Sequence, residues 1–110
     1  MERLARTFSA LSDETRLTML EHLLSTGEAA AGDLAALTHV SAPAVSRHLK
    51  VLREAGLVTQ RTEGTHRIYA ARAEAILSVA DWTEKHRKFW SGSLDRLDQL
   101  LSDDTEEDGR

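Results

Sequence analysis

The sequence predicts a mostly α-helical domain with one small β hairpin, and three features of the 110-residue chain indicate this fold class. Apolar residues recur at helical spacing over most of the chain. The stretch 57–70 is instead rich in Val, Ile, Thr and Tyr around a glycine, which is typical of a hairpin. Residues 38–40 separate two helical stretches by a short turn. We therefore expect five helices and a two-stranded hairpin in one domain over residues 1–101.

Two helices are expected before the first glycine. The first, over residues 3–11, has one apolar edge made of Leu4, Phe8 and Leu11. Ser12 or Asp13 can cap a second helix over Glu14–Ser25, and Gly27 is expected to end it. The predicted apolar positions of this second helix are Leu17, Leu20 and Leu24. The first of these helices is too short to be stable without a partner surface.

The next two helices are separated by a turn of three residues. Residues 30–37 form an Ala-rich helix with Leu34 and Leu37 predicted to face inward. In the turn that follows, His39 is expected to adopt the left-handed conformation, which His tolerates better than most residues. Two helices joined in this way are typical of a helix-turn-helix.

The helix after that turn, in the stretch Ser41 to Leu57, has two chemically different faces. Its apolar stripe is formed by Val45, Leu49 and Leu52, and the residues that face away from it are Pro43, Ser46, Arg47 and Lys50. Ser41 can cap its first turn, and Gly56 can end it in the left-handed conformation. A short hydroxyl and two cations on the exposed face suit the groove of a nucleic acid.

A hairpin is predicted from residue 57 to residue 70, with Gly64 in its tight turn. Arg61 and Arg67 lie on its two arms, and Thr65 and His66 lie near its tip. From such a wing, side chains can reach phosphates or a minor groove. The alternative is that the arginines only keep an edge strand soluble.

The charge distribution favours a nucleic-acid partner although the formal net charge is −4. Between Ser41 and Arg72 there are six basic residues and two acidic ones, a local balance of +4, so the remainder carries −8. Such asymmetry is typical of a protein whose cationic surface is confined to one face.

The last predicted helix, from about residue 73 to residue 101, is too long for the small core before it. Its larger apolar residues are Ile76, Val79, Trp82, Phe89, Trp90, Leu94, Leu97 and Leu101. We expect this surface to form a dimer interface. The alternative is that the aromatic residues cover the core of their own chain. Residues 102–110, with five acids and one base, are expected to be a disordered tail.

Several other classes of protein are disfavoured. The chain has no cysteine, and neither a signal peptide nor a membrane-spanning run is recognisable, so we expect a cytoplasmic protein without contact to a membrane. No nucleophile elbow, paired carboxylates or phosphate loop indicates an enzyme, and Asp81 with Glu84 is better explained as a solvated face. We expect no metal and no other cofactor, because the five histidines are scattered over separate elements: His22, His39, His48, His66 and His86.

Four motifs together resemble one known family. They are ALSDETRLTMLEHL, GDLAAL, SAPAVSRHLKVLREAGLV and EGTHRIY, and over residues 4–101 the chain resembles the ArsR-type winged helix-turn-helix repressors of bacteria. The resemblance implies a homodimer held by the first and last helices, with one recognition helix of each subunit in successive major grooves. It also implies that the dimer represses its own operon or an adjacent one.

The resemblance also assigns residues. It places Ser41, Ser46, Arg47 and His48 at positions that contact DNA in such proteins, with Ala42 where a Gln is usual. The resemblance also extends the expected dimer interface to Leu4 and Phe8 of the first helix. Lys50, Arg61 and Arg67 are expected to neutralise phosphates of a pseudo-palindromic operator.

The sensing part of the family carries over poorly. The cysteine box of metal-sensing members is missing here, and Asp81 is followed by Trp82 and Thr83 where other members have an Asp-x-His pair. The block DWTEKHRKFW is similar to the metal-independent autorepressors. Two alternatives remain: a winged-helix module that binds a partner protein, and a repressor that senses a small molecule through Trp82, Phe89 and Trp90.

Overall fold

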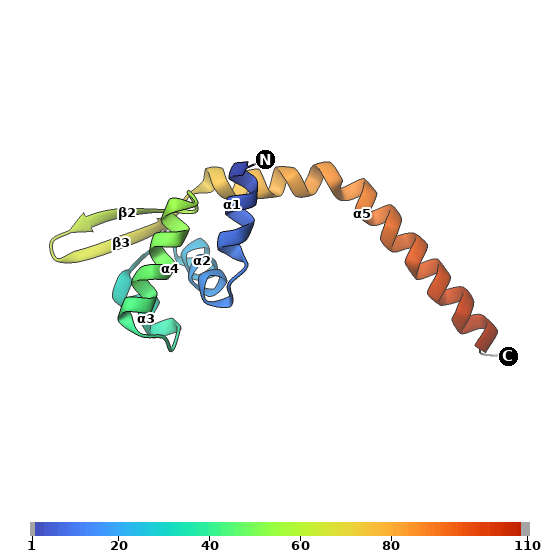
Figure 1. The fold of residues 1–110 in the computed structure, drawn as a ribbon, viewed down its shortest axis with the longest axis horizontal. Coiled ribbons are helices and arrows are strands. Elements are labelled where there is room, and N and C mark those ends of the chain that lie inside the picture. Colours follow the sequence, from blue (N-terminus) through green and yellow to red (C-terminus); the bar gives the residue numbers. More distant parts are fainter. Residues whose placement is uncertain (1, 109–110) are drawn as a thin grey trace. The chain divides into compact units, whose positions relative to one another are not determined.

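The computed structural model describes residues 2–108, and these form two compact units, one up to Ser78 and the other from Val79 onwards. Figure 1 shows the elements of the chain. Their order is α1 (Glu2–Leu11), α2 (Glu14–Thr26), β1 (Glu28–Ala30), α3 (Ala31–Leu37), α4 (Ala42–Glu54), β2 (Val58–Glu63), β3 (His66–Ala71) and α5 (Ala73–Asp108). The predicted fold class, five helices with a β wing, is confirmed. No helix among the described residues has the length and hydropathy to span a membrane.

The core of the first unit is built where α2, α3 and α4 pack against one face of the sheet. Its largest fully buried side chains are Met19, Leu23, Leu34, Leu49, Leu52, Leu57 and Val58. The predicted inner stripe of α4 is confirmed, because Val45, Leu49 and Leu52 are all buried. Burial of apolar area supplies most of the stabilising free energy, at about 25 cal/mol per Å².

The predicted inner stripe of α2 is wrong at two of its three positions. Leu20 is buried, but its buried companions are Met19 and Leu23, whereas Leu17 and Leu24 are exposed. Apolar residues lie on both sides of this helix, so helical spacing alone did not select the stripe. Leu37 of α3 is also exposed, although it was predicted to face inward.

Both ends of α4 are capped as the sequence predicts. The Ser41 side-chain oxygen accepts the backbone N–H of Ala44 at 3.3 Å. At the other end, Gly56 has φ +77° and donates its N–H to the Arg53 carbonyl at 3.0 Å, and Leu57 donates to the Leu52 carbonyl at 2.9 Å. This pair of bonds is a Schellman motif, and both leucines of its apolar contact are buried.

The predicted left-handed conformation of His39 is wrong. Among the described residues, positive φ occurs only at Gly27, Gly56 and Gly64. The turn before α4 is therefore made with ordinary backbone angles, ending in the extended conformation of Ser41 (φ −66°, ψ 157°).

The sheet has one strand more than predicted. β1 pairs antiparallel with β3, giving the strand order β1-β3-β2. Gly27, with φ +89°, turns the chain out of α2 so that Glu28 comes to lie opposite Ala70. A strand of three residues is too short to show an alternating pattern, which is why the sequence did not indicate it.

Helix α5 runs past the predicted domain end to Asp108, where the sequence predicted a disordered tail from residue 102. The chain has no proline or glycine between Gly92 and Gly109, so the helical hydrogen bonds continue through the acidic stretch. Residues 109 and 110 of the predicted tail lie outside the described residues.

Candidate nucleic-acid interface

The exposed face of α4 carries the residues that the sequence selected. Ser46, Arg47 and Lys50 are all exposed, opposite the buried stripe of the helix. Lys50 approaches Glu54 at 4.0 Å on the same face, and no hydrogen bond or ion pair engages the Arg47 guanidinium within the described part of the chain. This face can therefore present a hydroxyl and two cations to a ligand.

The first residues of α4 are also exposed. The Ser41 oxygen already accepts the Ala44 N–H, but its hydroxyl proton stays available to donate to a phosphate. Ala42 is exposed and offers a methyl group at the position where the family resemblance implies a Gln. A methyl group can contact a thymine methyl but cannot form the paired hydrogen bonds of an amide.

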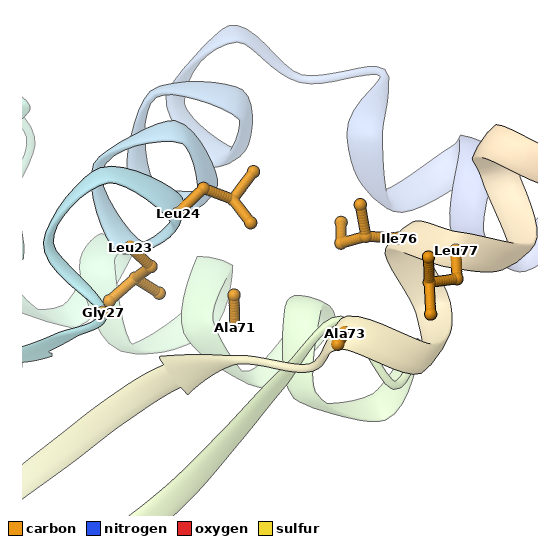
Figure 2. A pocket seen from close by; sticks show the side chains of 7 residues that line it. All are labelled: Leu23, Leu24, Gly27, Ala71, Ala73, Ile76 and Leu77. Atoms are coloured by element: carbon orange, nitrogen blue, oxygen red, sulfur yellow. The ribbon is translucent and has the colours of Figure 1, made fainter.

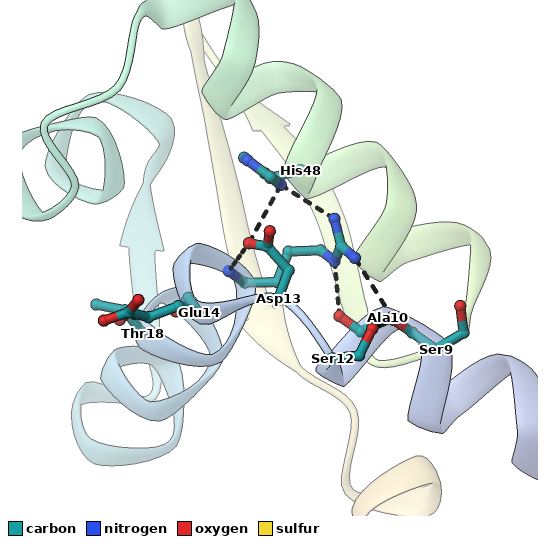
Figure 3. Close-up of polar contacts among 8 residues, drawn as sticks. Ser9, Ala10, Ser12, Asp13, Glu14, Thr18 and His48 are labelled. Atoms are coloured by element: carbon teal, nitrogen blue, oxygen red, sulfur yellow. Dashed lines mark hydrogen bonds and ion pairs between the residues drawn. The ribbon is translucent and has the colours of Figure 1, made fainter.

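The structure places His48 differently from the other predicted DNA contacts. Its side chain is only 21% exposed and lies on the flank of α4 that faces the start of α2. There its Nδ1 is 3.2 Å from Arg16 Nη1 and 3.8 Å from Asp13 Oδ2. Figure 3 shows the His48 ring directed toward Asp13, with these contacts drawn as dashed lines. Its imidazole is thus held inside the domain, and sequence spacing alone gave no sign of these partners.

The two arginines of the wing lie on opposite faces of the hairpin. In the β2–β3 register, Arg67 lies opposite Thr62, so these two side chains share one face of the hairpin. Arg61 precedes Thr62 on the same strand, and successive side chains of a strand point to opposite faces. Arg67 shares its face with Tyr69, whose hydroxyl donates to Gln60, and Gln60 in turn accepts from Arg53 of α4. Arg67 therefore lies on the face that packs against α4, whereas Arg61 lies on the opposite face.

Arg61 is also occupied by two carboxylates. Its guanidinium is 2.5 Å from Glu28 on β1 and 2.6 Å from Glu63 on its own strand. The hydrogen bond to Glu28, then that to Glu63, raises the pKa of Arg61 above its ordinary value. Among the described residues, no comparable partner engages the Arg67 side chain. Of the two wing arginines, Arg67 is thus the one that can bind a phosphate without first breaking ion pairs.

The hairpin tip is fully exposed. Glu63 and His66 pair across a two-residue loop of Gly64 and Thr65, and Gly64 has φ +63° as predicted. Figure 1 shows the hairpin projecting beyond the helices of its unit. Thr65 and His66 are both exposed there, where a phosphate or a groove edge can approach them.

The predicted dimer residues are apolar and mostly exposed in their own units. On α5, Phe89 is 61% exposed, Trp90 is 51% exposed, and Leu94, Leu97 and Leu101 are exposed as well, while Trp82 is half-buried. The rings of Phe89 and Trp90 meet edge to face with centroids 5.2 Å apart. On α1, Phe8 is exposed and Leu4 is half-buried.

An apolar hollow of about 350 Å³ lies between the end of α2, the end of β3 and the first turn of α5 (Figure 2). It is lined by Leu23, Leu24, Gly27, Ala71, Ala73, Ile76 and Leu77. None of these side chains has a polar atom that could orient a ligand. The aromatic residues predicted for a small-molecule sensor do not line this hollow.

Comparisons with known proteins agree on one family. Residues 13–60 match the family model of the bacterial regulatory proteins of the arsR family. The HTH-type transcriptional regulator Rv2034 of Mycobacterium tuberculosis is 41% identical over 103 residues, which cover 91% of this chain and 92% of that protein.

Two solved structures extend the similarity to the fold. An ArsR-like transcriptional regulator from Rhodococcus sp. RHA1 is 33% identical, with a TM-score of 0.68 over 90% of this chain and 92% of that one. The homodimeric winged helix-turn-helix DNA-binding domain Mb0332 from Mycobacterium bovis, described as a possible ArsR-family regulator, is 29% identical. Its TM-score is 0.61 over 78% of this chain and 84% of that one.

Proposed function

The chain belongs to the arsR family of bacterial regulatory proteins and is a winged helix-turn-helix transcriptional regulator, and from that premise we propose that it binds duplex DNA as a homodimer and represses its own or an adjacent operon. The single observation that carries the proposal is the exposed face of α4, where Ser46, Arg47 and Lys50 lie opposite the buried stripe. As a regulator of bacterial DNA, it would act in the cytoplasm, and we assign it no catalytic role.

We assign each predicted DNA contact one role in binding. Arg47 reads a guanine edge or holds a flanking phosphate, and Ser41 and Ser46 add hydrogen bonds. Lys50 and Arg67 neutralise phosphates. Ala42, Thr65 and His66 contribute contacts at the start of α4 and at the wing tip, whereas the ion pairs of Arg61 and its opposite face argue against a similar part for Arg61.

The homodimer is proposed on the apolar surface of α5, with α1 as the second helix of the interface. A symmetric dimer presents two copies of α4, so the operator is a pseudo-palindrome with half-sites about 34 Å apart. The homodimeric domain from Mycobacterium bovis, which shares this fold, supports the assignment.

The test compares three arginine variants on a duplex spanning the region upstream of its own gene and on a random duplex of equal length. We expect Arg47→Ala to weaken the free energy of binding to the upstream duplex by about 1–3 kcal/mol and to reduce the preference for that duplex over the random one. We expect Arg67→Ala to weaken binding to both duplexes alike. It should also lower the salt slope, that is, the slope of the logarithm of the binding constant against the logarithm of the salt concentration, by about 1. Titrations at several salt concentrations measure both effects.

Arg61→Ala is the matched control, because it removes the same charge from the other face of the same hairpin. Its affinity and salt slope should stay close to those of the unchanged protein. Unchanged affinity for Arg47→Ala and Arg67→Ala together would contradict the proposed interface. Affinity that does not fall with rising salt would instead favour the alternative, a winged-helix module that binds a protein partner.

A further inference from the structure

Arg16 of α2 holds the last turn of α1. Its Nε donates to the Ala10 carbonyl at 2.6 Å, and its Nη2 lies 3.5 Å from the Ser9 carbonyl. These carbonyls belong to the last turn of α1, where the helix itself supplies no hydrogen-bond donors. One guanidinium thus ties α2 to the end of α1.

The same guanidinium reaches the recognition helix. Arg16 Nη1 lies 3.2 Å from His48 Nδ1 of α4 (Figure 3). Because a guanidinium can only donate, the Nδ1 atom must accept, and the ring proton of the neutral histidine must then sit on Nε2. Asp13, which caps α2 by accepting the Arg16 backbone N–H at 3.1 Å, lies 3.8 Å from the same ring nitrogen.

This link differs in kind from the apolar contacts that hold α4. Val45, Leu49 and Leu52 anchor the helix through apolar burial, which is non-directional and lets a helix rotate or slide by small amounts. A charge-assisted hydrogen bond to a ring nitrogen is directional. Together with the hydrogen bond from Arg53 to Gln60 near the end of the helix, it therefore constrains the rotation of α4, and with it the direction of the Arg47 and Ser46 side chains.

We propose that Arg16 and His48 are positioning residues that couple α1 to the recognition helix, so that a shift of α1 at the subunit contact changes the orientation of the DNA-reading face. The proposal rests on the proposed function, because α1 is a subunit contact and α4 reads DNA only under that assignment. His48 then acts through α4 and touches no DNA, which replaces the contact that the family resemblance implied.

The test exploits the chemistry of the acceptor atom. His48→Leu removes the acceptor, whereas His48→Asn returns an oxygen to the δ position. We expect His48→Leu and Arg16→Lys each to lower the ratio of affinities for the upstream and random duplexes about tenfold. We expect His48→Asn to keep this ratio within about threefold of that of the unchanged protein. The Arg16→Lys/His48→Leu double variant should lower the ratio no more than either single change does. His22→Leu is the matched control, and sedimentation should show unchanged mass for every variant.

Other outcomes would overturn the link. Equal losses for His48→Leu and His48→Asn would show that the ring itself meets DNA, and full additivity in the double variant would show that the two residues act separately. A wild-type ratio in both His48→Leu and Arg16→Lys would leave the link without function.

A measurement without DNA separates this proposal from the proposed function. At about pH 8 the ring nitrogen resonances of His48 should show a protonated Nε2 and an unprotonated Nδ1. Backbone amides of α4 should exchange faster in Arg16→Lys than in the unchanged protein. A proton on Nδ1, or unchanged exchange, would overturn the link. A protein that ignores every duplex but shows both signatures would instead contradict the proposed function alone.

Discussion

Asp13 combines two interactions at the start of α2. Its Oδ2 accepts the backbone N–H of Arg16 and lies 3.8 Å from His48 Nδ1. The hydrogen bond from Arg16 foremost, with the charges of His48 and Arg16, lowers the pKa of Asp13 below its ordinary value. Because the folded pKa is the lower one, the stabilisation is present above the unfolded pKa of about 3.9 and is lost as pH falls through the folded pKa.

Asp13→Asn tests this at the residue scale, since asparagine keeps the capping oxygen but carries no charge. We expect a lower urea midpoint than that of the unchanged protein at pH 7, and a difference between the two midpoints that shrinks as the pH falls through the folded pKa of Asp13 and its carboxyl group becomes neutral. Asp95→Asn on the exposed surface of α5 is the matched control. Its urea midpoint should differ from that of the unchanged protein by the same amount at neutral and at acidic pH. A constant difference for Asp13→Asn at all pH values would contradict the charge argument.

The end of α4 depends on one backbone conformation. Gly56 has φ +77°, and no atom lies within 4 Å of the position a Cβ would take, so space is not the constraint. The left-handed conformation alone disfavours a side chain there. Since Leu52 and Leu57 on either side of it are fully buried, this cap also determines how β2 enters the core.

Gly56→Ala and Gly32→Ala form a matched pair at the scale of the element. Gly32 lies in α3 without a positive φ and also has nothing within 4 Å of its Cβ position. We expect Gly56→Ala to lower the free energy of unfolding by about 1–2 kcal/mol, and Gly32→Ala to raise it by up to about 1 kcal/mol. Urea unfolding curves measure both, and equal effects of the two substitutions would contradict the conformational explanation.

At the scale of the whole molecule, α5 exposes large apolar side chains along much of its length, and contiguous exposed apolar patches mark interaction sites. In the unit from Val79 onwards, Trp90, Leu94 and Leu97 follow one another at spacings of four and three residues and are all exposed. A spacing of this kind is typical of a seam between two helices. Each chain therefore offers a second copy a continuous apolar stripe.

Leu97→Glu tests that stripe against Ser91→Glu, which adds the same charge to the polar side of the same helix. We expect Leu97→Glu to shift the sedimentation mass toward that of one chain at micromolar concentration, because burying an unpaired carboxylate in the seam is costly. Its affinity for the upstream duplex should fall with the loss of dimer, while Ser91→Glu stays dimeric and binds normally. A dimeric Leu97→Glu protein would exclude this surface as the interface.

The order of the five helices and the hairpin, the caps of α2 and α4, the buried stripe of α4 and the cationic exposed face were all determined by the sequence itself. Each depends on residues within about one or two helical turns of one another, so spacing and local chemistry suffice. The opposite faces of Arg61 and Arg67 also follow from the two-residue turn at Gly64 by simple alternation, a signal that the sequence analysis did not use.

Only the tertiary structure decided which side of α2 is buried, that Glu28 joins the sheet, and which groups hold His48. The bonds concerned join residues 32 positions apart for Arg16 and His48 and 33 apart for Glu28 and Arg61. Local patterns carry no information about such partners, because a partner is selected by how whole elements pack rather than by its distance along the chain. The family resemblance assigned His48 to DNA, whereas packing places its ring against α2, 3.2 Å from Arg16.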